Sequence, residues 1–204
     1  MTQVTIYSDG ACRGNPGPGG WGTIIVYGDA EKVLSGGEAG TTNNRMELRG
    51  AIEGLAALKT PCQVKLVSDS QYLVSAINQG WLKNWIRCGW RRSDGSPVIN
   101  PDLWRELVEQ LKIHDVTFEW IKGHAGHPYN ERCDELATTE ADRIAKEAAA
   151  HDDERREEIA ARAEDKKSRL LAAQEAIKKI DRQIADLEAQ KKALLASLRE
   201  EELS

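Results

Sequence analysis

Four acidic residues occupy positions where the amino-acid sequence predicts the end of a strand or the first turns of a helix. Asp9 and Asp69 each follow a short strand-like segment, whereas Glu47 and Asp134 fall early in helix-prone segments. Neighbouring parallel strands of an open α/β sheet present their carboxyl ends at one edge, where ligands bind. Carboxylates that meet there repel one another, and a hard divalent cation such as Mg²⁺ or Mn²⁺ relieves that repulsion. Two such ions about 4 Å apart promote displacement at phosphorus by activating water and stabilising the leaving oxygen.

Each acid taken alone has a simpler explanation. A single Asp or Glu is more often a helix cap or a solvated surface charge, and Asp9, which precedes Gly10, is also typical of a turn. The metal-site interpretation therefore depends on the elements that would bring the four acids together.

Those elements alternate between strand and helix patterns. A Gly-, Pro- and Asn-rich loop is expected at 10–20. The expected strands are 3–8, 21–27, 32–38, 64–68 and 116–121, and the expected helices are 43–58, 71–78, one from Asn100-Pro101 and one from near Tyr129. This order predicts an α/β fold with a mixed five-stranded sheet, in which an antiparallel meander joins parallel βαβ units.

The helix expected at 43–58 explains how Glu47 could reach the sheet. Its apolar face is formed by Leu48, Ile52 and Leu55. Glu47 lies off that face and is aligned with three small residues that would allow close approach to the sheet, namely Gly50, Ala51 and Gly54.

The contexts of these acids resemble those of a known family, the bacterial-type (cellular type 1) ribonucleases H. The resemblance covers residues 1 to about 145, and its motifs follow in order and at fitting spacing. They are Tyr-Ser-Asp-Gly-Ala-Cys at 7–12, Gly-Asn-Pro-Gly-Pro-Gly-Gly-Trp at 14–21, Thr-Thr-Asn-Asn-Arg-Met-Glu-Leu at 41–48, Val-Ser-Asp-Ser-Gln-Tyr at 67–72, Trp-Ile-Lys-Gly-His-Ala-Gly-His at 120–127 and Asn-Glu-Arg-Cys-Asp at 130–134.

The resemblance implies a ribonuclease H-like fold, with helices flanking the sheet, and an endonuclease that cuts the RNA strand of RNA–DNA hybrids, leaving 3′-hydroxyl and 5′-phosphate ends. It implies two Mg²⁺ ions with substrate bound, with Mn²⁺ as a possible substitute. The family's metal-binding and catalytic carboxylates fall on Asp9, Glu47, Asp69 and Asp134. Its loop histidine falls on His124, with an implied role in proton transfer or product release, whereas His127 is expected to be structural or exposed to solvent.

Recognition of a hybrid requires contacts with 2′-hydroxyls across a shallow minor groove. The resemblance assigns this role to Cys12, Asn15, Asn43, Asn44 and Gln71, with Thr42 and Asn15 at a phosphate of the DNA strand and Asn130 among the substrate-binding residues. The simpler explanation for Asn43-Asn44 is helix capping, and we expect one of the two to cap.

A basic segment at 81–92 resembles the family's substrate-binding protrusion. It contains four basic residues and three tryptophans but no acid, and we call it the basic patch: Trp81, Lys83, Trp85, Arg87, Trp90, Arg91 and Arg92. Basic residues neutralise phosphates and aromatic surfaces pack on sugars. Alternatively, the tryptophans only anchor the segment. We expect Trp85 to be mostly in the core, with Trp81 and Trp90 nearer the substrate.

Bulk composition gives weaker information. The formal net charge of −5 argues against a nucleic-acid binder until the basic patch is considered separately. No run approaches the roughly 20 apolar residues of a membrane span, and no secretory signal is recognisable. The four cysteines form no CxxC pair, so we expect free thiols and a cytoplasmic protein.

After Pro128 the chain contains neither glycine nor proline and is rich in strong helix formers. We expect a catalytic domain at 1–147 and a helical extension at 148–204. A heptad pattern at 170–198 predicts a coiled coil, with seam residues Leu170, Ala173, Ile177, Ile180, Ile184, Leu187, Lys191, Leu194 and Leu198.

The extension is open to three interpretations: dimerisation through the heptads, a helical hairpin that pairs Ile159 and Ala163 with the later coil, or docking on another protein. Separately, the segment before the heptads is either one solvated helix or contains a bend at 151–153, where an Asp would cap a new helix. We favour self-association, and the helix orientation stays undecided. For the whole chain, the alternatives to an active nuclease are an inactive hybrid-binding scaffold and a transposase- or polymerase-linked nuclease. Retention of all four acids and His124 argues against a scaffold, and the absence of a further catalytic domain argues against the latter.

Overall fold

The protein contains one five-stranded mixed sheet. A computed structural model describes the backbone of residues 1–201 and the side chains of residues 1–195. The strands are β1 (Thr2–Cys12), β2 (Gly17–Tyr27), β3 (Ala30–Thr41), β4 (Cys62–Ser68) and β5 (Asp115–Trp120). Their order across the sheet is β3-β2-β1-β4-β5; β1 pairs antiparallel with β2 and parallel with β4. The predicted mixed sheet is therefore confirmed.

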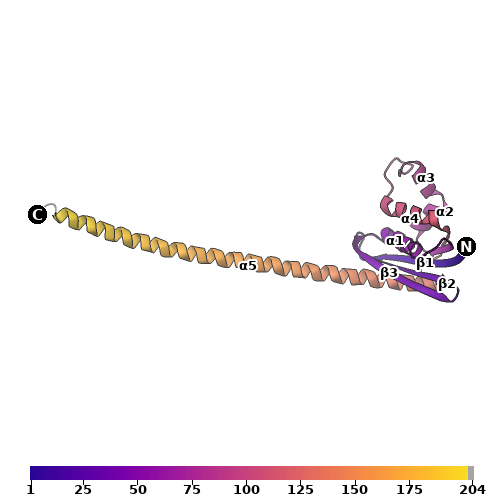
Figure 1. Ribbon diagram of the computed structural model, residues 1–204, viewed down its shortest axis with the longest axis horizontal. Helices are drawn as coiled ribbons and strands as arrows, with labels where there is room; N and C mark the ends of the chain where they lie inside the picture. Colours follow the sequence, from indigo (N-terminus) through magenta and orange to yellow (C-terminus); the bar gives the residue numbers. More distant parts are fainter. Residues whose placement is uncertain (202–204) are drawn as a thin grey trace. The chain divides into compact units, whose positions relative to one another are not determined.

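Helices cover both faces of this sheet. They are α1 (Asn43–Ala56), α2 (Gln71–Asn78), α3 (Trp81–Arg87), α4 (Pro101–Ile113) and α5 (Pro128–Glu201). Helices α1 and α4 lie on one face, and the first turns of α5 lie on the other (Figure 1). Helix α3 lies in the basic patch and was not predicted. The prediction for this segment used its charged and aromatic residues and not its periodicity.

The core lies mainly between the sheet and α1. Leu48, Ile52 and Leu55 are buried, as the apolar face predicted. A Cβ at Gly54 would meet the Ile6 side chain at 2.9 Å, and the Gly50 carbonyl accepts a hydrogen bond from the Thr23 hydroxyl at 2.7 Å. The small residues therefore allow α1 to contact the sheet closely.

Two local expectations were wrong. Most of the predicted 10–20 loop is strand, because β1 continues to Cys12 and β2 begins at Gly17. Neither Asn43 nor Asn44 caps α1: Thr42 is the N-cap residue, and it makes no side-chain capping bond. Asn100 does precede α4 as expected, but with φ of 56° it also makes no side-chain capping bond.

The chain divides into two units, Met1–Ala150 and His151–Ser204. Helix α5 is continuous through residues 151–153. No new helix therefore begins at this point. The seam residue Leu198 lies outside the residues whose side chains are described. Within the described part of the chain, no helix is long and apolar enough to cross a membrane.

Candidate active site

The parallel pairing of β1 with β4 places Asp9 and Asp69 at the same edge of the sheet. Tyr7 pairs with Val67 in this ladder. Asp9 lies two residues beyond Tyr7, and Asp69 lies two residues beyond Val67. The two carboxylates therefore reach the carboxyl ends of neighbouring strands at the same level.

Glu47 joins this edge because α1 packs directly against the backbone after Asp9. A Cβ at Gly10 would lie 2.6 Å from the Met46 carbonyl carbon, so only glycine fits there. The Asn43 amide donates to Glu47 Oε1 at 2.8 Å, and the Ser70 hydroxyl donates to Glu47 Oε2. Two hydrogen bonds thus hold the Glu47 carboxylate.

Asp134 approaches from the opposite face of the sheet. Gly22, which pairs with Asp9 across β1 and β2, has no side chain to keep α5 away. A Cβ at Gly22 would lie 2.6 Å from the Leu136 side chain, and one at Gly20 would lie 2.6 Å from the Ala141 backbone nitrogen. Glycines on β2 therefore allow the first turns of α5 to bring Asp134 beside β1.

The electrostatics show that these acids interact. Burial raises the pKa of Asp9 to about 8, with further contributions from the negative charges of Asp69, Asp134 and Glu47. The hydrogen bond from the Gly10 amide, at 2.7 Å, opposes this rise. Burial also raises the pKa of Glu47 to about 7, assisted by Asp69 and opposed by the hydrogen bonds from Ser70 and Asn43.

This oxygen donor set suits a hard divalent cation, since a positive charge would offset both the burial and the mutual repulsion. The arrangement is nevertheless open. Among the described residues, no three His, Cys, Asp or Glu side chains come together closely enough to hold a metal ion. The acids therefore converge on one edge, but their side chains do not close around a common point.

The loop between β5 and α5 packs against Asp69. A Cβ at Gly123 would collide with the Asp69 carboxylate, so the loop backbone lies directly on it. The next residue, His124, is exposed and has a φ of 52°. His124 is therefore attached to a backbone that contacts one of the acids. His127, by contrast, is half-buried, with its ring 5.2 Å from that of Tyr7, and so has a structural position.

Asn130, predicted to bind substrate, lies beside Asp69. It is buried, and its amide donates to Asp69 Oδ2 at 3.1 Å. Its side-chain oxygen is also buried, with no hydrogen-bond partner. Asn130 therefore contacts a carboxylate of the acidic edge.

The other residues assigned to the hybrid differ in exposure. Asn15, Asn44 and Gln71 are exposed, whereas Thr42 is half-buried at the start of α1. The Cys12 thiol is half-buried and donates to the carbonyls of Gly17 and Thr41, each at 3.5 Å.

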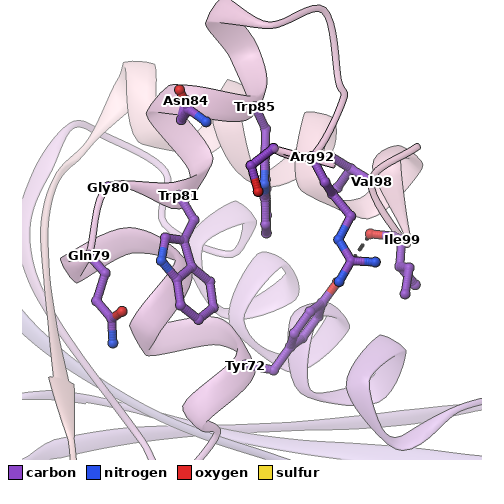
Figure 2. A pocket seen from close by; sticks show the side chains of 10 residues that line it. Tyr72, Gln79, Gly80, Trp81, Asn84, Trp85, Arg92, Val98 and Ile99 are labelled. Carbon is purple, nitrogen blue, oxygen red and sulfur yellow. Dashed lines mark hydrogen bonds between the residues drawn. The ribbon is translucent and has the colours of Figure 1, made fainter. Parts of the chain in front are cut away.

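The basic patch borders a pocket of about 530 Å³. Figure 2 shows Trp81 and Trp85 on one side of this pocket and Arg92 extending toward Tyr72 on the other. Trp81 is 41% exposed. Trp85 packs against the core, with its ring 5.4 Å from that of the buried Trp104. Trp85 is thus packed against the core as expected, whereas the position of Trp81 relative to the substrate stays a prediction.

The remaining members of the patch do not behave alike. Lys83, Arg87, Arg91 and Arg92 are exposed. The Arg91 guanidinium donates to the Gly95 carbonyl at 2.9 Å, which ties it to its own loop. Trp90 is half-buried and packs against the core, and the Arg105 guanidinium lies 5.0 Å from its ring centre. One face of Trp90 is therefore covered.

Two contributors to the site were missed in the sequence. Ser70 contacts Glu47 and also caps α2, where its hydroxyl accepts a hydrogen bond from the Leu73 amide at 3.1 Å. A serine directly before a predicted helix is a capping signal and could have identified it. Gly123 carried no such signal, because its role depends on a long-range contact.

The chain is similar in sequence and in structure to known ribonucleases H. Residues 1–142 match the RNase H family model. Ribonuclease H of Hahella chejuensis is 58% identical over 137 residues, covering 67% of this chain and 92% of that protein. The solved structure of LC9-RNase H1, a type 1 RNase H with the type 2 active-site motif, is similar with a TM-score of 0.62 and 35% identity, covering 69% of this chain and 72% of that one. The structure of LC11-RNase H1 in complex with RNA/DNA hybrid is similar with a TM-score of 0.51 and 25% identity, covering 69% of this chain and 97% of that one.

The five-stranded mixed sheet with its flanking helices defines a ribonuclease H-like fold. The chain belongs to the RNase H family, as a bacterial-type, type 1 member. It is thus an enzyme with ribonuclease H activity.

The raised pKa of Asp9 gives a prediction for stability. Its folded-state pKa, about 8, lies above the ordinary value of 3.8, so ionisation destabilises the fold progressively as pH rises from about 4 to about 8. In buffer with a chelator at pH 8, Asp9→Asn should raise the free energy of unfolding by at least about 1.4 kcal/mol, the equivalent of one pKa unit. Urea titrations of both proteins at pH 5 and pH 8 measure this, and the difference should widen with pH.

Asp102→Asn is the matched control for that measurement. Asp102 accepts two hydrogen bonds from Arg45, at 3.1 and 2.8 Å, and this pairing lowers its pKa. Neutralising Asp102 should therefore stabilise the protein at neither pH. Equal stabilities of wild type and Asp9→Asn at pH 8 would contradict the account of a strained acidic edge.

Proposed function

We propose that the chain hydrolyses internal phosphodiester bonds in the RNA strand of RNA–DNA hybrids with two divalent cations, leaving 3′-hydroxyl and 5′-phosphate ends. The supporting observation is the convergence of four carboxylates from β1, α1, the end of β4 and α5 on one sheet edge, where burial and neighbouring acids raise the pKa of Asp9. The hybrid complex of the similar LC11-RNase H1 supports the substrate class.

Asp9, Glu47, Asp69 and Asp134 would hold the cations, Mg²⁺ or Mn²⁺. The chemistry that two bound cations supply is activation of water and stabilisation of the leaving 3′-oxygen. The protein's own contribution is to hold the carboxylates at fixed positions. Asn43 and Ser70 hold Glu47, and Asn130 holds Asp69. Partners of this kind orient metal ligands and are needed for full activity.

His124 would move a proton at the leaving group or assist release of the product. Its side chain is exposed, and its backbone neighbour Gly123 lies against Asp69. The imidazole is therefore free to approach substrate bound at the acidic edge and to withdraw again.

Discrimination of RNA from DNA would come from polar groups beside the acids. The exposed amides of Asn15, Asn44 and Gln71 can contact 2′-hydroxyls and phosphates, with Cys12, Thr42 and Asn43 nearby along the start of α1 and the end of β1. The basic patch, with Trp81 exposed beside its pocket, would bind the hybrid backbone at a distance from the acids.

The first test is cleavage of a labelled RNA–DNA hybrid in the presence of Mg²⁺, with duplex DNA and single-stranded RNA as controls. We expect cleavage of the hybrid RNA strand alone, and analysis of the fragments should find 3′-hydroxyl and 5′-phosphate ends. Asp9→Asn should abolish cleavage while remaining folded by circular dichroism. An intact hybrid with both Mg²⁺ and Mn²⁺ would favour the alternative of an inactive hybrid-binding scaffold.

The second test concerns Asn130. Asn130→Ala removes the hydrogen bond to Asp69, so cleavage should fall roughly 10–100-fold at limiting Mg²⁺. If Asn130 acts through Asp69, the concentration of Mg²⁺ that gives half-maximal cleavage should rise, with little change in the KM for hybrid. A change confined to the KM would instead place Asn130 on the substrate. Asn78→Ala, which removes an amide bonded to the Phe118 carbonyl in the same unit, is the matched control.

The third test concerns the basic patch. Binding of the hybrid without divalent ions should weaken as salt increases, since each neutralised phosphate releases counterions. Replacing Lys83 and Arg92 together by alanine should reduce the slope of log affinity against log salt by about one for each lost phosphate contact. Lys112→Ala, which removes a cation paired with Glu109 outside the patch, should leave the slope unchanged. An unaltered slope in the double variant would remove the patch from the substrate interface.

A further inference from the structure

The distal part of α5 carries a stripe of exposed aliphatic side chains. Leu170, Ile177, Ile180, Ile184 and Leu187 are each between 49% and 62% exposed. From residue 170 they follow alternating steps of three and four that also include Ala173 and Lys191, which correspond to heptad positions a and d. A seven-residue apolar repeat keeps its seam on one side only when helices supercoil around one another.

The segment of α5 before this stripe has a different character. Between residues 151 and 169 its only large apolar side chain is Ile159, and it contains intrahelical ion pairs at i,i+4 and i,i+3 spacing: Arg162 with Glu158 at 2.8 Å, Arg169 with Asp165 at 3.0 Å and Arg156 with Asp153 at 3.3 Å. Such pairs support a helix that needs no packing partner. The part of α5 that needs a packing partner for its apolar stripe therefore begins near residue 170.

We propose that residues 170–194 form a parallel, two-stranded coiled coil with a second copy of this chain. This surface is independent of the nuclease site and does not depend on the reaction proposed for it. The choice of a second copy, the number of strands and their direction follow from the residue types at the seam and beside it.

The seam residues favour two parallel strands. Position a holds Leu170, Ile177, Ile184 and Lys191, and position d holds Ala173, Ile180, Leu187 and Leu194. Isoleucine at a with leucine at d, as at Ile184 and Leu187, favours parallel dimers, whereas Ile180 at d alone does not. Lys191 occupies an a position, and a single lysine there restricts the number of strands. In a two-stranded coil its long stem can cover the seam while the ammonium group reaches water, whereas a larger bundle would enclose it.

The flanking charges are compatible with self-pairing in the parallel direction. Positions g and e′ would then pair without any two like charges, as Arg169 with Gln174, Ala176 with Asp181 and Gln183 with Glu188. An antiparallel pair that keeps a and d′ in common layers instead brings Asp181 beside Asp181 of the second copy and sets Lys191 against Ala173. The parallel arrangement avoids this repulsion and this mismatch.

The mass of the full chain in solution tests the proposal. Wild type at tens of micromolar should sediment with twice the 22.6 kDa mass of one chain. Ile177→Glu with Ile184→Glu puts charge into the seam and should give the mass of one chain. Ala172→Glu with Ala185→Glu adds the same charges at positions c and b, off the seam, and should leave the doubled mass. A wild-type mass of one, three or four chains would overturn the proposal.

Cross-linking tests the direction of the helices. Under mild oxidation, Ala173→Cys at position d should form a covalent dimer linked through residue 173, identified by peptide mapping against wild type because Cys88 is also exposed. Ala185→Cys at position b should not. A covalent dimer that forms only when the Ala173→Cys chain is mixed with a Lys191→Cys chain would place the helices antiparallel and overturn the orientation.

Discussion

Repulsion among carboxylates at one end of the sheet is the constraint on which the catalytic unit depends. Burial, with smaller contributions from the charges of Asp69, Asp134 and Glu47, raises the pKa of Asp9 to about 8, so the ionised form of Asp9 is unfavourable there. Without other interactions, this repulsion would move the carboxylates apart. Here, hydrogen bonds to Glu47 from Asn43 and Ser70, and to Asp69 from Asn130, keep the acids in place. The same repulsion would be relieved by the divalent cations proposed to bind at this edge.

Close backbone contacts make this crowding possible. Gly10 admits α1, Gly22 admits α5 and Gly123 allows the following loop to lie on Asp69. At each of these positions a Cβ would collide with an atom of an acid-bearing or acid-contacting element. The geometry of the site therefore depends on these glycines as much as on the acids themselves.

Much of this arrangement followed from the sequence. Alternating and helical patterns gave the strand and helix order, and the apolar face of 43–58 gave the position of Glu47 relative to the sheet. Position-specific contacts could not be obtained in this way. The sequence motif that contains Asn130 predicted contact with the substrate. It could not show that the Asn130 amide is buried against Asp69, because the two residues are far apart in the sequence. Trp90 was expected near the substrate, but Arg105, fifteen residues away, covers one of its faces.

Chain order adds a consequence to the heptad seam of α5. The catalytic unit ends before the seam begins, so a parallel coil starts with both catalytic units at the same end. Once one catalytic unit of the dimer binds a hybrid, the second unit can bind the same hybrid molecule. Its effective concentration there is set by the length of chain that connects the two units, and not by the protein concentration in solution. Hybrids long enough for two footprints would be retained longer than short ones, even though each active site is unchanged. Substrate length would then be sensed through the heptad seam rather than through the active site.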